Sequence, residues 1–147
     1  MSESDSKVAE HLPFVPPIVQ PESDFFWQEL RAHRLVLRHC EACDAPYFYP
    51  RDHCPRCLSS ATRWIEASGR GRLYSFAIVH RAPSAIFEAS VPYIVALVDL
   101  DEGPRVATNL LGVSPDPDAI EIGIPVEAVF DDVSDQWTLL RFRPAPP

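Results

Sequence analysis

Two CxxC pairs, Cys40–Cys43 and Cys54–Cys57, constrain the fold of this chain more than any other feature. Ten residues separate the pairs, enough for a hairpin to bring them together. Four thiolates at this spacing are typical of a tetrahedral structural zinc site, as each short turn directs two sulfur atoms at one ion. We therefore expect Cys40, Cys43, Cys54 and Cys57 to bind one zinc ion per chain; rubredoxin-type iron is the alternative.

Other uses of the cysteines fit the sequence less well. Disulfides would require an oxidising compartment, and the polar, acidic segment 1–10 does not have the pattern of a signal peptide. No apolar run approaches the ~20 residues of a membrane-spanning helix, so we expect a cytoplasmic protein. His39 and His53 precede the two pairs and could replace a thiolate, but four thiolates already fill the coordination sphere. The predicted site is therefore structural.

The remaining pattern predicts a mainly β fold. Ser23 or Asp24 is expected to cap a helix over 25–33, with Phe26 and Leu30 on one face. Short strands are expected at 35–39 and 62–67, around the cysteines. Five further strands, at 72–81, 93–100, 105–111, 126–131 and 137–143, predict a small closed OB-fold barrel, with an open antiparallel sheet as the alternative. We thus divide the chain into an extended arm (1–21), the helix with a rubredoxin-like zinc ribbon (22–67) and an OB-fold (68–147).

No residues are expected to be catalytic. The sequence contains no phosphate-binding loop and no nucleophile motif, and all four cysteines are assigned to metal. His80 has no carboxylate near it in sequence to orient its ring. An enzyme whose site assembles only in three dimensions remains an alternative.

The charge disfavours nucleic acid as a ligand. The net charge is -8 and the chain has a single lysine, Lys7, whereas nucleic-acid binding needs a positive field. OB-folds can nevertheless bind single strands on aromatic side chains, and Tyr47, Phe48 and Tyr49 beside Arg51 could stack on bases. Single-stranded nucleic-acid binding is therefore the alternative function.

The combined motifs resemble a known family, the zinc-ribbon plus OB-fold proteins of domain-of-unknown-function family thirty-five. Besides the cysteine pairs with Pro55-Arg56, the matching residues are Phe26-Trp27, Leu30, Phe48-Tyr49-Pro50-Arg51, Trp64, Ser68-Gly69-Arg70-Gly71, Tyr74-Ser75-Phe76, Pro92-Tyr93, Asp101-Glu102-Gly103-Pro104-Arg105 and Ile122-Gly123-Ile124-Pro125-Val126. The resemblance covers about residues 25–142, and the arm before Pro21 lies outside it.

The resemblance implies a non-catalytic accessory subunit. Family members pair with thiolase-like enzymes, including steroid side-chain aldolases of lipid metabolism, or with acyl-CoA hydratases, and have been proposed to bind acyl-CoA. The arginines that could meet coenzyme A phosphates are Arg51, Arg56, Arg70, Arg72 and Arg81. We expect Phe25, Phe26 and Trp27 to contact the partner, because so small a core leaves no room for them. Ile86 and Phe87, in an adaptable loop over 82–91, are expected to contact it as well.

Overall fold

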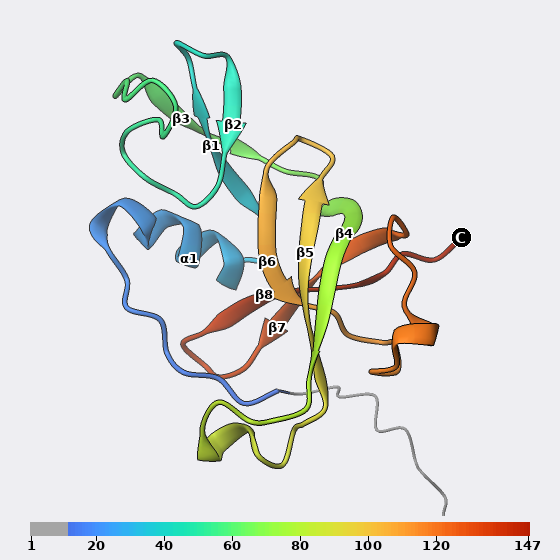
Figure 1. Ribbon diagram of the computed structural model, residues 1–147. Coiled ribbons are helices and arrows are strands. Elements are labelled where there is room, and N and C mark those ends of the chain that lie inside the picture. Colours follow the sequence, from blue (N-terminus) through green and yellow to red (C-terminus); the bar gives the residue numbers. More distant parts are fainter. Residues whose placement is uncertain (1–11) are drawn as a thin grey trace, which may run out of the picture.

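The computed structural model describes residues 12–147 and contains two β-sheets with one α-helix between them (Figure 1). The predicted mainly β architecture is confirmed. Residues 1–11 of the expected arm lie outside the described residues, and 12–20 form neither helix nor strand. None of the described helices is long and apolar enough to cross a membrane.

The smaller sheet carries the cysteines. Its central strand β1 (Val36–Cys40) pairs antiparallel with β2 (Ala45–Tyr47) on one side and with β3 (Thr62–Glu66) on the other. Both pairings reach Cys40, which lies opposite Ala45 of β2 and Thr62 of β3. The strand β2 has no counterpart in the sequence-based prediction, because three residues are too few to show an alternating pattern.

The larger sheet forms the expected barrel. Its five strands are β4 (Arg70–Val79), β5 (Tyr93–Leu100), β6 (Arg105–Asn109), β7 (Pro125–Asp132) and β8 (Thr138–Pro144). They are ordered β6-β5-β4-β7-β8, and a parallel bridge between Leu110 and Phe142 brings the two edges together. The OB-fold is therefore confirmed, and the open sheet is excluded.

A glycine makes the start of this barrel possible. Gly71 on β4 pairs with Leu100 of β5 on one side and with Val126 of β7 on the other. A Cβ atom at this position would lie 2.4 Å from the backbone oxygen of Asp99. Only glycine lets the three strands approach so closely.

The helix α1 (Asp24–Arg31) connects the two sheets through its buried face. As expected from their spacing, Phe26 and Leu30 share that face, and only 2% and 0% of their surfaces are exposed. Ser23 stands at the N-cap position, but its hydroxyl donates back to the Gln20 carbonyl at 3.1 Å rather than capping the helix. The helix ends before the predicted residue 33, because His33 adopts a left-handed φ of 58°.

Phe26 and Trp27 of α1 pack within the chain, so the expectation that the core has no room for them is wrong for these two residues. Phe26 meets Phe48 and Tyr49 edge-on, with ring centroids 5.6 and 5.9 Å apart. The indole N–H of Trp27 donates to the Tyr49 hydroxyl at 3.2 Å, and its ring meets Trp137 edge-on at 5.7 Å. These contacts join the helix to the ribbon on one side and to the barrel on the other.

A buried hydrogen-bond network around Arg141 ties four barrel strands together. Arg141 on β8 is 4% exposed, and its Nε donates to Asp131 Oδ2 on β7 at 2.7 Å. Its Nη1 donates to Asn109 Oδ1 on β6 at 2.6 Å, and the Asn109 amide donates to the Ile94 carbonyl at 3.0 Å. This network reinforces the closure between β6 and β8, which otherwise meet through an isolated bridge.

We predict that Arg141→Ala lowers the free energy of unfolding by about 3 to 5 kcal/mol, because it leaves the buried Asp131 carboxylate without its cation. The matched control is Arg143→Ala on the same strand. Arg143 pairs with Glu127 at 2.8 Å, but its side chain is 57% exposed, and we expect a loss of about 1 kcal/mol or less. Urea denaturation measures both, and equal losses would contradict the structural role of Arg141.

Candidate metal centre

The two cysteine pairs occupy two tight turns of the ribbon. The first pair begins at Cys40, the last residue of β1, and Cys43 follows in the turn to β2. The second pair lies in the long connection between β2 and β3. In each turn the residue after the second cysteine is left-handed, with φ 52° at Asp44 and 62° at Leu58.

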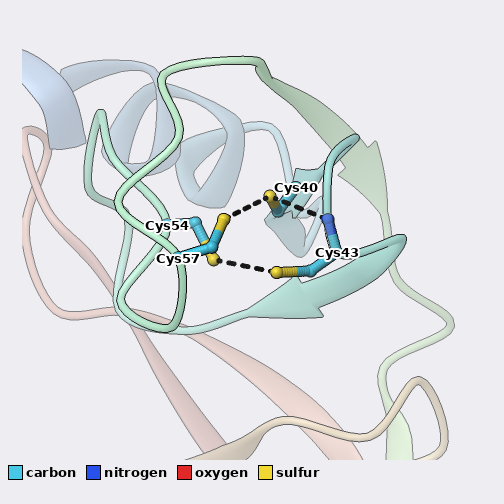
Figure 2. Close-up of side chains that lie close together, drawn as sticks. All are labelled: Cys40, Cys43, Cys54 and Cys57. Atoms are coloured by element: carbon cyan, nitrogen blue, oxygen red, sulfur yellow. Dashed lines mark hydrogen bonds between the residues drawn. The ribbon is translucent and has the colours of Figure 1, made fainter.

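These turns bring four sulfur atoms together (Figure 2). All four Sγ atoms lie within 4.8 Å of one another. The Cys40–Cys57 and Cys43–Cys54 sulfur pairs are 3.7 and 3.9 Å apart. A tetrahedron with metal–sulfur bonds of about 2.3 Å has edges of about 3.8 Å, so the thiols fit a tetrahedral ion such as zinc.

The surrounding backbone stabilises sulfur in its charged form. The N–H groups of Cys43 and Arg56 each lie 3.4 Å from a sulfur atom, that of Cys40 and that of Cys54 respectively. Backbone donation, chiefly from Cys57, lowers the pKa of Cys54 to about 7. Contact with the Cys57 sulfur raises the pKa of Cys43 to about 12. A cation would remove the repulsion between successive thiolates and release the remaining protons.

The histidines stay outside the sulfur cluster. Among the described residues, the only group of three or more His, Cys, Asp or Glu side chains that converges closely enough to hold an ion is the four cysteines. The ring of His39 instead lies 3.4 Å from the Asp44 carboxylate, and His53 is exposed. The thiols alone therefore provide four ligands, which leaves no position for substrate.

The aromatic residues considered as a stacking platform for nucleic acid are not available for it. Tyr47 is buried, and its hydroxyl donates to the Arg51 carbonyl. Phe48 and Tyr49 are turned toward Phe26 of α1. This loop thus builds the core rather than a surface for bases.

The five arginines proposed for acyl-CoA are all exposed, but they do not form one site. Arg51 and Arg56 lie in the ribbon loop. Arg70 and Arg72 border a cleft of about 260 Å³ at the start of β4, which is also lined by Asp101 and Glu127. Arg81 follows the other end of β4, roughly 30 Å from Arg72 along an extended strand.

The residues expected to meet a partner also separate. Phe26 is buried, and Trp27 is partly buried against Trp137, so neither ring forms an open surface. Phe25 remains 40% exposed and packs on Trp64 at 5.0 Å. In the β4–β5 loop, Ile86 of the short helix η2 (Ala85–Phe87) is 50% exposed, whereas Phe87 packs on Tyr93 at 5.8 Å.

Sequence reasoning missed two exposed apolar features. One is a shallow depression of about 560 Å³ on the outer face of β4, β5 and β6, where Val95 and Leu97 are exposed beside Ala77 and Ala107. Along β5, Val95 and Leu97 alternate with buried Ile94, Ala96 and Val98. A strand that is apolar on both faces is the sequence signal that could have revealed this surface. The other is Leu58, which is 74% exposed.

Comparison with known proteins matches both parts of the chain. Residues 27–63 match the family model "ChsH2, rubredoxin-like zinc ribbon domain", and residues 64–131 match "ChsH2, C-terminal OB-fold domain". The solved structure of an "Ltp2-ChsH2(DUF35) aldolase" aligns with a TM-score of 0.77 and 39% identity, over 89% of this chain and 100% of that one.

Two relatives show how the same region occurs in other proteins. A "Probable enoyl-CoA hydratase alpha subunit" of Thermomonospora curvata is 40% identical over 89% of this chain, which spans only 40% of that relative. A "DUF35 domain-containing scaffold protein" of Methanocaldococcus jannaschii is 32% identical over 74% of this chain and 77% of its own length. From the matches to both domains and to full-length relatives, this chain belongs to the DUF35 family of zinc-ribbon and OB-fold proteins.

Proposed function

We propose that this protein is a non-catalytic accessory subunit that docks on an acyl-CoA enzyme of the thiolase, aldolase or hydratase type. The observation that carries the proposal is the match over the whole length of a chain from the Ltp2-ChsH2(DUF35) aldolase. The hydratase alpha subunit supports the same role in a second type of enzyme, and the name of the scaffold protein agrees with a non-catalytic role. We place this role in the cytoplasm, where cysteines remain reduced.

The architecture suits a rigid subunit that docks on an enzyme and carries no catalytic groups of its own. The aromatic contacts of α1 fix the ribbon against the barrel, so the two parts can present one continuous surface. Within residues 12–147, the four-thiol cluster is the only group of three or more His, Cys, Asp or Glu side chains that converges closely enough to hold an ion. Four thiolates occupy every position around a tetrahedral ion, which favours stabilisation of the fold over chemistry.

We further propose that the metal is zinc, with one ion per chain held by Cys40, Cys43, Cys54 and Cys57. The sulfur spacing and the family of the ribbon support this identity. Zinc has no redox chemistry and accepts a tetrahedron of thiolates. Its contribution here would be to the stability of a module that has little apolar core of its own.

Contact with acyl-CoA is a separate part of the proposal. Arg70 and Arg72 are the best candidates to meet its phosphates, because two neighbouring guanidinium groups border one cleft. Asp101 and Glu127 line the same cleft and would partly offset this attraction. The remote Arg81 does not belong to this group.

The docking role predicts that the chain is inactive alone and forms a stable complex with an acyl-CoA enzyme subunit of the same organism. Co-expression followed by size-exclusion chromatography should show both chains in one peak. Activity of the partner should fall when this chain is omitted and return when it is added back. The proposal would be wrong if the partner is fully active alone and the two chains elute separately.

Elemental analysis should find one zinc per chain in protein purified without added metal. Cys40→Ser should lose the zinc and unfold the ribbon while the barrel strands persist, because most residues of the main buried cluster lie in the barrel. His53→Ala is the matched control and should retain the metal, as His53 is exposed and outside the sulfur cluster. One equivalent of iron, or folded protein with four titratable thiols and no metal, would refute the assignment.

A further inference from the structure

Leu58 is placed in a conformation and an environment that both disfavour leucine. It follows the last cysteine with a φ of 62°, which lies in the left-handed region. Any residue with a Cβ atom is strained in this region, whether or not its side chain branches at Cβ. Its side chain is 74% exposed, so no packing within the described residues compensates for this conformation. A strained, exposed apolar residue is a candidate for binding.

The first cysteine turn shows that the backbone itself does not demand leucine. The equivalent residue there is Asp44, at φ 52°. Aspartate enters the left-handed region more readily than apolar residues do, and its carboxylate suits solvent. The same backbone requirement is thus met by a well-tolerated residue in one turn and by a poorly tolerated one in the other.

Leu58 is also held rigidly. Its N–H donates to the Cys54 carbonyl at 2.9 Å, and the Cys54 N–H donates to the Ser59 carbonyl at 2.9 Å. A metal ion bound by Cys54 and Cys57 would fix the same turn further. A side chain presented on a rigid turn loses little conformational entropy when it binds.

The loop around Leu58 carries free positive charge in an acidic chain. Residues 51–58 contain Arg51 and Arg56, both exposed, and a single acidic residue, Asp52. Within residues 12–147, no carboxylate lies at ion-pair distance from Arg51 or Arg56. The same holds for Arg31, Arg38, Arg70, Arg72 and Arg81, whereas Arg34, Arg63, Arg105, Arg141 and Arg143 have such partners. Arginines beside an apolar anchor are typical of interface hot spots.

We propose that the loop over residues 51–58 is the principal docking element for the partner enzyme subunit. Leu58 inserts into an apolar pocket of that subunit, and carboxylates at the pocket rim pair with Arg51 and Arg56. This assignment rests on the proposed accessory role. Coenzyme A phosphates would explain the arginines but not the exposed leucine, so the surface fits a protein better than this ligand.

The test uses Leu58→Gly and Leu58→Asn, because both residues accept the left-handed backbone and remove the apolar side chain. Both variants should retain their metal and a Tm no lower than that of the unmodified chain, while affinity for the partner subunit falls about tenfold or more. The control is Ile122→Ala in the barrel, where an equally apolar side chain is 55% exposed. Calorimetric titration with the partner subunit, without acyl-CoA, should show no change for this control.

The possible outcomes separate this inference from the role on which it rests. If the unmodified chain does not bind the subunit, the accessory role itself fails. If the unmodified chain binds and both Leu58 variants bind equally well, only the docking assignment is overturned. Arg56→Glu should weaken binding and reduce its dependence on salt. The titration is then repeated with acyl-CoA present, and a loss that appears only under this condition would assign the loop to that ligand and overturn the docking of a protein.

Discussion

The convergence of four cysteine sulfur atoms is the constraint on which the ribbon depends. Its own buried cluster consists of Cys40, Tyr47 and Cys54, with Cys43 packed against it. Apolar burial on this scale cannot offset the conformational entropy of ordering the segment. Without a cation, thiolates held less than 5 Å apart also repel one another. An ion at their centre, which we propose to be zinc, removes that repulsion and becomes the main interaction that stabilises the folded ribbon.

A layer of aromatic rings connects the ribbon that carries the metal centre to the barrel. The loop between the cysteine pairs supplies Phe48 and Tyr49, which meet Phe26 of α1. On the barrel side, Trp27 of the same helix meets Trp137 in the β7–β8 connection. The ribbon therefore positions the helix, and the helix positions the ribbon against the barrel. A subunit that presents surfaces from both parts to an enzyme benefits from this rigidity, because less freedom is lost on binding.

Local patterns predicted most of the fold, whereas the sequence did not reveal contacts between distant segments. The spacing of the cysteines predicted which residues converge, and the i, i+4 relation of Phe26 and Leu30 predicted the buried face of the helix. The destination of that face could not be predicted, since its contacts come from loops and strands far along the chain. The burial of Arg141 could not be predicted either, because it depends on the approach of β6 to β8. Arg72 and Arg81 were grouped as ligands for coenzyme A phosphates, although the length of the predicted strand between them already separates the two.

The position of α1 affects how such proteins can diverge by recombination. In sequence the helix belongs with the ribbon, but Trp27 packs on Trp137, and Arg31 donates to the Asp135 carbonyl at 3.2 Å. A crossover near residue 68, at the apparent boundary between ribbon and barrel, would join a helix from one parent to a β7–β8 hairpin from another. The mismatched tryptophan contact would then lie in the layer that holds the two parts together. Ribbon and barrel are thus expected to be inherited as one unit, even where that unit is joined to other domains.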